Sequence, residues 1–286
     1  MGTQVYGTKM KTIAIANQKG GCGKTTTAVN LAAAFTTFGK RILIIDLDPQ
    51  AHTTLGFGHI PDDLNKTVYD AITRAQVPVS RVQIPISRTI INTNVNGLHL
   101  APSNILLSGV EFELSAVYGR EYVLQQQLET ISGDYDICVI DCSPSLSLLT
   151  LNALVASTDV IIPVQTQYYA LEGLKQLLET IDIVNERFNP TLKILGVLLT
   201  FVESRTLLSK QVQQQMRDFF GDLVFETVIH RTTTLAEAPS AGEPILAYAP
   251  KSKGAAEYNA LAEEIINSRI SHKETDSAKV LAEQIT

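Results

Sequence analysis

The chain has little cysteine: only Cys22, Cys138 and Cys142 occur among 286 residues. Three thiols cannot build the disulfide set that holds small secreted domains together, and their number suits a reducing cytosol. The longest apolar run, 192–202, contains Lys193, and it is shorter than the roughly 20 apolar residues that cross a bilayer. The first residues, MGTQVYGTKMKT, hold no apolar stretch typical of a secretory signal. We therefore expect a soluble, cytoplasmic protein.

The chain also lacks an excess of positive charge, with 23 Lys and Arg against 29 Asp and Glu and a net charge of −6. This balance argues against a protein that coats nucleic acid with its whole surface. The charges are unevenly spread, because residues 187–254 contain eight basic and six acidic side chains, whereas the rest contains 15 and 23. Two interpretations stay open, a local basic patch on an acidic body and an ordinary scatter of surface charge.

Short runs rich in Ile and Val alternate with longer amphipathic stretches, and several runs, such as ILIID and ICVID, are apolar on both faces. Such runs suit central parallel strands that helices cover on both sides. The expected strands are 12–17, 41–46, 97–101, 136–141, 159–164, 192–201 and 223–229. The expected helices are 24–38, 108–117, 120–131, 146–156, 170–187, 207–220 and 255–268.

This alternation predicts an α/β fold: a doubly wound, mostly parallel sheet with helices on both faces. With 45% hydrophobic residues, the chain can bury a sizeable core. The sequence shows neither an internal repeat nor a low-complexity linker, so we expect a single domain over 11–270. Residues 1–10 would form an N-terminal extension, and the polar residues 271–286 a C-terminal tail.

The sharpest local signal is the segment QKGGCGKTT at 18–26. It follows the expected strand TIAIAN and opens the expected helix TTTAVNLAAAF, which are the flanks that a phosphate-binding loop requires. Its glycines allow backbone N–H groups to converge on phosphate oxygens, and the helix N-terminus adds a favourable dipole. Lys24 would reach the β- and γ-phosphates, and the Thr25 hydroxyl would ligate Mg²⁺. The predicted nucleotide-binding residues of the loop are Lys19, Gly20, Gly21, Cys22, Gly23, Lys24, Thr25 and Thr26.

Three aspartates stand at the ends of expected strands. Asp46 and Asp48 follow one apolar run, and their spacing places both on one face if the strand persists. Asp141 ends the run DICVID. An isolated aspartate at a strand end is often a cap or turn residue, but a phosphate loop on a neighbouring strand favours a role in the site for all three.

The loop has the form K-G-G-x-G-K-T-T, with Gln18 where an ordinary Walker A motif has glycine. It resembles the deviant Walker A motif of the ParA/MinD group of ATPases. The resemblance runs from about residue 11 to 268 and is most specific to the ParA/Soj branch, which partitions chromosomes and plasmids. It rests on GKRILIIDLDPQAHTT, YDICVIDCSPSLSLLTLNAL, VIIPVQTQYYALEGL and LAEAPSAGEPILAYAPKSKGAAEYNALAEEI. It implies a P-loop fold, Mg²⁺-dependent ATP hydrolysis to ADP and phosphate, and homodimer formation on ATP binding.

The resemblance also implies roles for single residues. Lys19 is expected to reach the nucleotide of a second subunit, where a cation would offset negative charge near the γ-phosphate. Asp46 would contact the Mg²⁺ shell, Asp48 would position the attacking water, and Asp141 would hold Mg²⁺ through water. Lys24 completes the expected catalytic set with Lys19 and Asp48.

Phe201 and His230 are the expected adenine-side residues, although His230 replaces a proline of the family pattern. A lone histidine near a loop is more often a hydrogen-bonding surface residue than a catalyst. The cysteines are not expected to hold an iron–sulfur cluster, because Cys22 would face phosphate and Cys138 is expected to be a buried side chain within a strand.

In the ParA/Soj branch the ATP-bound dimer binds nonspecific DNA, and a ParB-type partner stimulates hydrolysis. The matching DNA-binding positions here are Arg205, Arg231, Lys251 and Lys253. For Arg205, a solvated helix start is the competing interpretation. Thr234 stands where many relatives carry a second DNA-contacting arginine, so weaker DNA binding and a different cargo surface both stay open. The resemblance places the protein in the cytoplasm, associated with the nucleoid.

Two other functions compete with this one. A membrane-associated protein of MinD type would end in a basic amphipathic helix, whereas the tail SHKETDSAKVLAEQIT is polar and mixed in charge. A metabolic ATP-dependent ligase on the same fold usually needs no second loop lysine, so Lys19 and the ALEGL and AEAPS segments argue against it.

Overall fold

The computed structural model describes residues 10–73, 84–167 and 171–267. Within these ranges seven strands form one sheet in the order β3-β4-β2-β5-β1-β6-β7. Their bounds are β1 (Lys11–Ile15), β2 (Ile42–Leu47), β3 (Ile91–Asn92), β4 (Leu98–Ala101), β5 (Ile137–Cys142), β6 (Asp159–Gln165) and β7 (Lys193–Thr200). All neighbours pair in parallel except β3 with β4. The predicted mostly parallel sheet is therefore confirmed.

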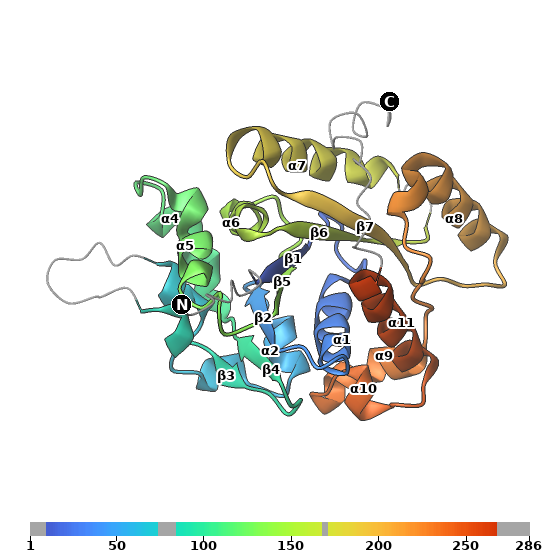
Figure 1. Cartoon of the computed structure of the whole chain (residues 1–286), viewed down its shortest axis with the longest axis horizontal. Coiled ribbons are helices and arrows are strands. Elements are labelled where there is room, and N and C mark those ends of the chain that lie inside the picture. The colour runs from blue at the N-terminus through green and yellow to red at the C-terminus, as the bar shows by residue number, and fades with distance from the viewer. Residues whose placement is uncertain (1–9, 74–83, 168–170, 268–286) are drawn as a thin grey trace, which may run out of the picture.

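Helices cover both faces of this sheet (Figure 1). The α-helices are α1 (Lys24–Thr36), α2 (His52–Gly56), α3 (Val68–Ile72), α4 (Val110–Glu113), α5 (Val123–Glu129), α6 (Leu148–Ala156), α7 (Lys175–Arg187), α8 (Leu207–Phe220), α9 (Thr233–Glu237), α10 (Ile245–Tyr248) and α11 (Lys253–Asn267). The 3₁₀ helices are η1 (Pro61–Asp63), η2 (Ile86–Arg88), η3 (Ile105–Gly109), η4 (Arg120–Tyr122), η5 (Glu172–Leu174), η6 (Gly221–Leu223) and η7 (Ala238–Ala241). None of the helices in the described ranges is both long and apolar enough to span a membrane.

The core lies in two layers, one on each face of the sheet. Apolar side chains of α1, α9, α10 and α11 pack against one face, and those of α3 to α8 pack against the other. All six residues of β2 and all six of β5 are buried, as their uninterrupted apolar runs predicted. The central strands are thus fixed from both sides, which gives their ends a rigid position.

The predicted strand 223–229 is wrong. Among the described residues this region forms only isolated bridges beside β7 and the residues after it. The Glu264 carboxylate accepts hydrogen bonds from the backbone N–H groups of Glu226 and Thr227, at 2.9 and 3.0 Å. These two donors are therefore unavailable to a strand ladder.

The predicted helix 108–117 is also wrong in extent, because only η3 and the short α4 form there. The hydroxyls of Ser108 and Ser115 donate to carbonyls three residues back, at 2.8 and 2.7 Å, which favours tight turns over a continued helix. Outside the described residues lie the start of the predicted helix at Ala170, the end of the predicted helix at Ser268, the predicted tail 271–286, and all of the predicted extension 1–10 except Met10.

The strands β1, β2 and β5 end at one edge of the sheet. Register pairs Ile15 of β1 and Asp46 of β2 with the same residue of β5, Asp141. The loop after β1 and the two aspartates are therefore neighbours, as expected for the carboxyl ends of parallel strands.

Candidate nucleotide-binding site

The loop between β1 and α1 has the backbone that a phosphate cradle needs. Gly21 and Gly23 adopt φ values of 72° and 88°, a left-handed conformation that side chains disfavour. Gly23 also caps α1, so the first N–H groups of this helix face the loop. A Cβ added at Gly20 or Gly21 would meet none of the described atoms within 4 Å. This open loop can accept the oxygens of a phosphate chain.

Lys24 folds back over the loop. Its ammonium group donates to the Lys19 carbonyl oxygen at 3.0 Å and lies 4.0 Å from the sulfur of Cys22. Only 7% of Lys24 is exposed. A buried ammonium group favours an anion as its partner, and a bound phosphate chain would supply one.

Asp141, near the end of β5, lies against the first turn of α1. Its Oδ2 accepts hydrogen bonds from the hydroxyls of Thr25 and Thr53, at 2.8 and 2.7 Å. Its Oδ1 is buried and has no hydrogen-bond partner among the described residues. Burial raises the pKa of Asp141 to about 6, although the two hydroxyls and Lys24 oppose this rise.

The oxygens of Thr25 and Asp141 fit a magnesium ion. Mg²⁺ prefers hard oxygen ligands and usually takes only one or two from the protein, with water and phosphate oxygens supplying the rest. The unpartnered Oδ1 of Asp141 is an acceptor without a role in the fold. In the described ranges no group of three or more His, Cys, Asp or Glu side chains could hold a metal ion.

Both carboxylate oxygens of Asp46 accept hydrogen bonds from neighbouring residues. Its Oδ1 accepts from the N–H of Asp48 at 3.2 Å, and its Oδ2 accepts from the N–H and the hydroxyl of Thr54, at 2.8 and 2.7 Å. Burial and the Asp141 carboxylate raise the pKa of Asp46 to about 7. In this structure Asp46 holds the turn that follows β2, and its contact with the Mg²⁺ shell stays a prediction.

Asp48 lies in that turn and is 8% exposed. Its Oδ1 accepts from the N–H of Gln50 at 3.0 Å, and its carbonyl oxygen accepts from the Ser103 hydroxyl at 2.6 Å. Its Oδ2 makes no hydrogen bond to another described residue. The backbone of Asp48 is thus fixed, and its role in positioning the attacking water stays a prediction.

Two cavities adjoin the phosphate loop. One, of about 350 Å³, is lined by Gly23, Thr26, Phe201, His230 and Tyr258, among others. The other, of about 400 Å³, lies between α1 and α2 and also touches Thr26. Both volumes fall within the range of ligand pockets. The first brings together the predicted adenine-side residues and the loop. The second is lined by loop residues and by part of the LAEAPS segment, and it was not predicted from the sequence as a binding site.

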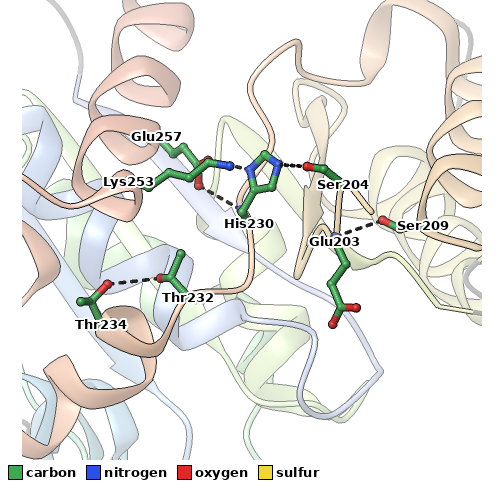
Figure 2. Close-up of polar contacts among 8 residues, drawn as sticks. All are labelled: Glu203, Ser204, Ser209, His230, Thr232, Thr234, Lys253 and Glu257. Carbon is green, nitrogen blue, oxygen red and sulfur yellow. Dashed lines mark hydrogen bonds and ion pairs between the residues drawn. The ribbon is translucent and has the colours of Figure 1, made fainter. Parts of the chain in front are cut away.

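His230 is the link between three segments (Figure 2). Its Nδ1 lies 2.6 Å from Glu257 of α11, and its Nε2 lies 2.9 Å from the Ser204 hydroxyl. The second Glu257 oxygen accepts from the His230 backbone N–H at 2.9 Å. Because both ring nitrogens are engaged, a base in the adjoining cavity would meet the ring rather than a free nitrogen of His230. Glu257 and Ser204 escaped prediction because they lie far from His230 in sequence.

Lys19 lies at the surface of its own subunit. Its N–H donates to the Asn17 side chain at 3.0 Å, and its ammonium group lies 3.5 Å from the Gln167 side-chain oxygen. The two loop lysines therefore differ: Lys24 is buried at the loop, whereas Lys19 is exposed beside it.

The structure brings the four predicted DNA-binding residues to the segments around His230. Arg231 follows His230 directly, Arg205 follows Ser204, and α11 begins at Lys253, two residues after Lys251. Arg231 lies 3.4 Å from the Glu203 carboxylate and Lys253 lies 3.7 Å from Glu257. Arg205 and Lys251 are exposed and form no ion pair with another described residue. Thr234, half-buried, donates to the Thr232 hydroxyl at 3.3 Å.

Comparison with known proteins gives matches over most of the chain. A family described as "AAA domain" matches residues 10–194. The sporulation initiation inhibitor protein Soj of Bacillus subtilis is 47% identical over 255 residues, covering 89% of this chain and 98% of Soj. The chromosome partitioning protein ParA of Myxococcus xanthus is 42% identical over 265 residues, covering 93% of this chain and 91% of that one.

Among solved structures, one from Mycobacterium smegmatis has the same fold, with a TM-score of 0.79 and 37% identity over 94% of this chain and 99% of that one. It is described as cobyrinic acid a,c-diamide synthase with a bound ATP analogue and magnesium.

Proposed function

The chain belongs to the ParA/Soj family of partition ATPases, and we propose that it is an ATP-driven switch. In this proposal two subunits associate on binding ATP, the dimer binds DNA without sequence preference, and hydrolysis stimulated by a ParB-type partner releases it. The observation that carries the proposal is the contact between the Thr25 hydroxyl and the buried Asp141 carboxylate beside an open phosphate loop. Cycles of this switch would segregate or position a cargo, which would be a chromosome, a plasmid or a protein assembly.

ATP would bind at the open phosphate loop, beside the buried ammonium group of Lys24. The ammonium group of Lys24 would leave the Lys19 carbonyl oxygen for the β- and γ-phosphates, and the loop N–H groups would hold the same oxygens. Thr25 and Asp141 would hold Mg²⁺, which when bound neutralises charge on the phosphate oxygens. Asp48 would orient the attacking water, with its backbone held by Ser103.

The exposure of Lys19 supports a role between subunits. Among the described residues of its own subunit, its ammonium group has one hydrogen-bond partner, the side-chain oxygen of Gln167 at 3.5 Å. In a dimer it would place positive charge near the γ-phosphate of the partner's nucleotide. ATP would then be part of the contact between subunits, and the loss of the γ-phosphate would weaken that contact.

Retention on a random DNA duplex tests the proposal, with ATP, ADP or no nucleotide at a series of salt concentrations. We expect retention with ATP only, with an affinity that falls steeply as salt rises. Lys251→Gln should reduce the salt slope by about 0.9 for each protomer that contacts DNA. Lys193→Gln is the matched control, because Lys193 is exposed but begins β7 at the opposite edge of the sheet. ATP-driven dimerisation without retention at low salt would leave an ATPase and refute nucleoid binding.

Two alternatives are tested in the same preparation. Pelleting with anionic vesicles in the presence of ATP would favour a positioning ATPase of MinD type. The name of the M. smegmatis structure favours a second alternative, an ATP-dependent synthase. A synthase would need a small carboxylic acid to turn over ATP, whereas the proposed switch hydrolyses ATP slowly without one.

A further inference from the structure

The predicted DNA-contacting residue Arg231 already has an anionic partner within its own subunit. Its guanidinium Nη1 lies 3.4 Å from the Glu203 carboxylate, with 70% of the Arg231 side chain and 47% of the Glu203 side chain exposed. A DNA phosphate approaching this surface would therefore have to compete with Glu203. From this contact, and resting on the proposed DNA-binding function, we propose that Glu203 is an intramolecular competitor of DNA phosphate that lowers the affinity of the dimer for DNA.

Glu203 is held in a position to compete. Its backbone N–H donates to the hydroxyl of Ser209 at 3.2 Å, and Ser209 is buried in the first turn of α8. Figure 2 shows the Glu203 side chain directed away from His230. On the other side, the N–H of Arg231 donates to the Val202 carbonyl oxygen at 3.2 Å. The backbones that carry the two charges are thus fixed side by side, while the charges themselves stay at the surface.

The nearby Glu257 does not act in this way. Its carboxylate is only 13% exposed and accepts two hydrogen bonds from His230. It therefore holds its place whether or not a phosphate is near. Lys253, 3.7 Å from it, has three N–H donors and can use the others toward a phosphate. The half-exposed Glu203 can turn away into solvent, so of these two ion pairs the one between Glu203 and Arg231 is exchangeable.

The expected size of the effect follows from the exposure of the pair. An exposed ion pair is worth little because water and salt screen it, so removing the competing charge should raise affinity by about two- to fivefold for each protomer that engages DNA. If the freed Arg231 gains a phosphate contact, the plot of log affinity against log salt steepens by about 0.9 per protomer.

The test compares retention on a random DNA duplex, with ATP and across a salt series, for the wild type, Glu203→Gln, Arg231→Gln and the double variant. Glutamine keeps the size of Glu203 and removes its charge. Glu226→Gln is the matched control, because Glu226 forms a surface ion pair of the same length, 3.4 Å, with Arg217 in the last turn of α8. About ten residues of helix, roughly 15 Å, separate the two pairs, which exceeds the screening length near 0.15 M salt.

We expect tighter binding and a steeper salt slope for Glu203→Gln, no change for Glu226→Gln, and loss of the gain in the double variant. If Glu203→Gln raised DNA affinity equally with Arg231 present and with Arg231→Gln, the gain would be a general effect of charge, and the inference would be overturned. If the wild type binds DNA and Glu203→Gln matches it, the inference fails and the proposed function stands. If neither protein binds DNA with ATP at low salt, both fail.

Discussion

We predict that the buried Asp46 and Asp141 contribute more to the stability of the nucleotide-free protein as the pH falls from 8 to 5. Asp46 is fully buried and its pKa is raised to about 7, first by burial and then by the Asp141 carboxylate. A group whose pKa is higher in the folded state binds protons on folding, so stability is gained as the pH falls through the folded pKa. For Asp46 this gain is about 2.5 kcal/mol between pH 8 and 5. The pKa of Asp141, about 6, lies in the same range, so the pair titrates together.

Asp46→Asn isolates the effect, because asparagine keeps the shape and an acceptor oxygen but cannot ionise. Urea unfolding in EDTA, followed by circular dichroism because the chain has no tryptophan, gives the free energy of unfolding at each pH. The stability of the variant relative to the wild type should be highest at pH 8 and should fall by about 2.5 kcal/mol toward pH 5.

The matched control for this experiment is Asp136→Asn. The Arg41 side chain lowers the pKa of Asp136 through hydrogen bonds. The stability that this pair contributes is lost only as the pH falls through that low pKa, below the range tested. The difference between this variant and the wild type should therefore stay constant from pH 8 to 5. A constant difference for Asp46→Asn as well, or one that grows toward low pH, would refute the reasoning.

Three further predictions concern the loop, the turn and the sheet. Lys24→Ala removes a charge-assisted contact and should weaken ATP affinity by about 10- to 150-fold, which isothermal titration would detect; unchanged affinity would remove Lys24 from the site. Asp48→Ala should bind ATP yet accumulate as dimers in size-exclusion runs with ATP, and normal ATP hydrolysis would show that Asp48 does not orient the water. Gly196→Ala would place a Cβ 2.6 Å from the Phe225 ring and 2.9 Å from the Leu223 carbonyl oxygen, so it should cost about 1–3 kcal/mol in urea unfolding. Gly133→Ala, where a Cβ meets none of the described atoms, is its control.

Sequence patterns predicted the parts of this protein that are local. The fully buried strands β2 and β5 were predicted from uninterrupted apolar runs. The phosphate loop was predicted from glycines and lysines that lie within a few residues of one another. The pattern failed at 223–229, where the apolar run suggests a strand but Glu264 takes two of its backbone donors. No local signal marks that contact, because it joins residues almost forty positions apart.

The candidate site divides in the same way. That Asp141 and Thr25 belong to one site could be inferred from two strand ends, since parallel strands bring their carboxyl ends together. The hydrogen bonds of Asp46 to Thr54 and to the N–H of Asp48 could not be inferred from the sequence, because they depend on the path of the turn after β2.

The backbone around Phe201 connects the cavity beside the phosphate loop with the surface that carries Arg231. Val202 donates to the carbonyl oxygen of Ile229 at 3.0 Å and accepts from the N–H of Arg231 at 3.2 Å. Phe201 and the segment 229–232 line the cavity beside the phosphate loop, while Glu203 and Arg231 form the exposed ion pair. A change of backbone at Phe201, whose φ is 52°, would therefore shift the next two residues and with them the position of Glu203. The cavity and the ion pair share one hydrogen-bonded pair of segments, so a change of backbone at the cavity would move the ion pair, whereas the exposed Glu203 side chain can turn away without moving the backbone.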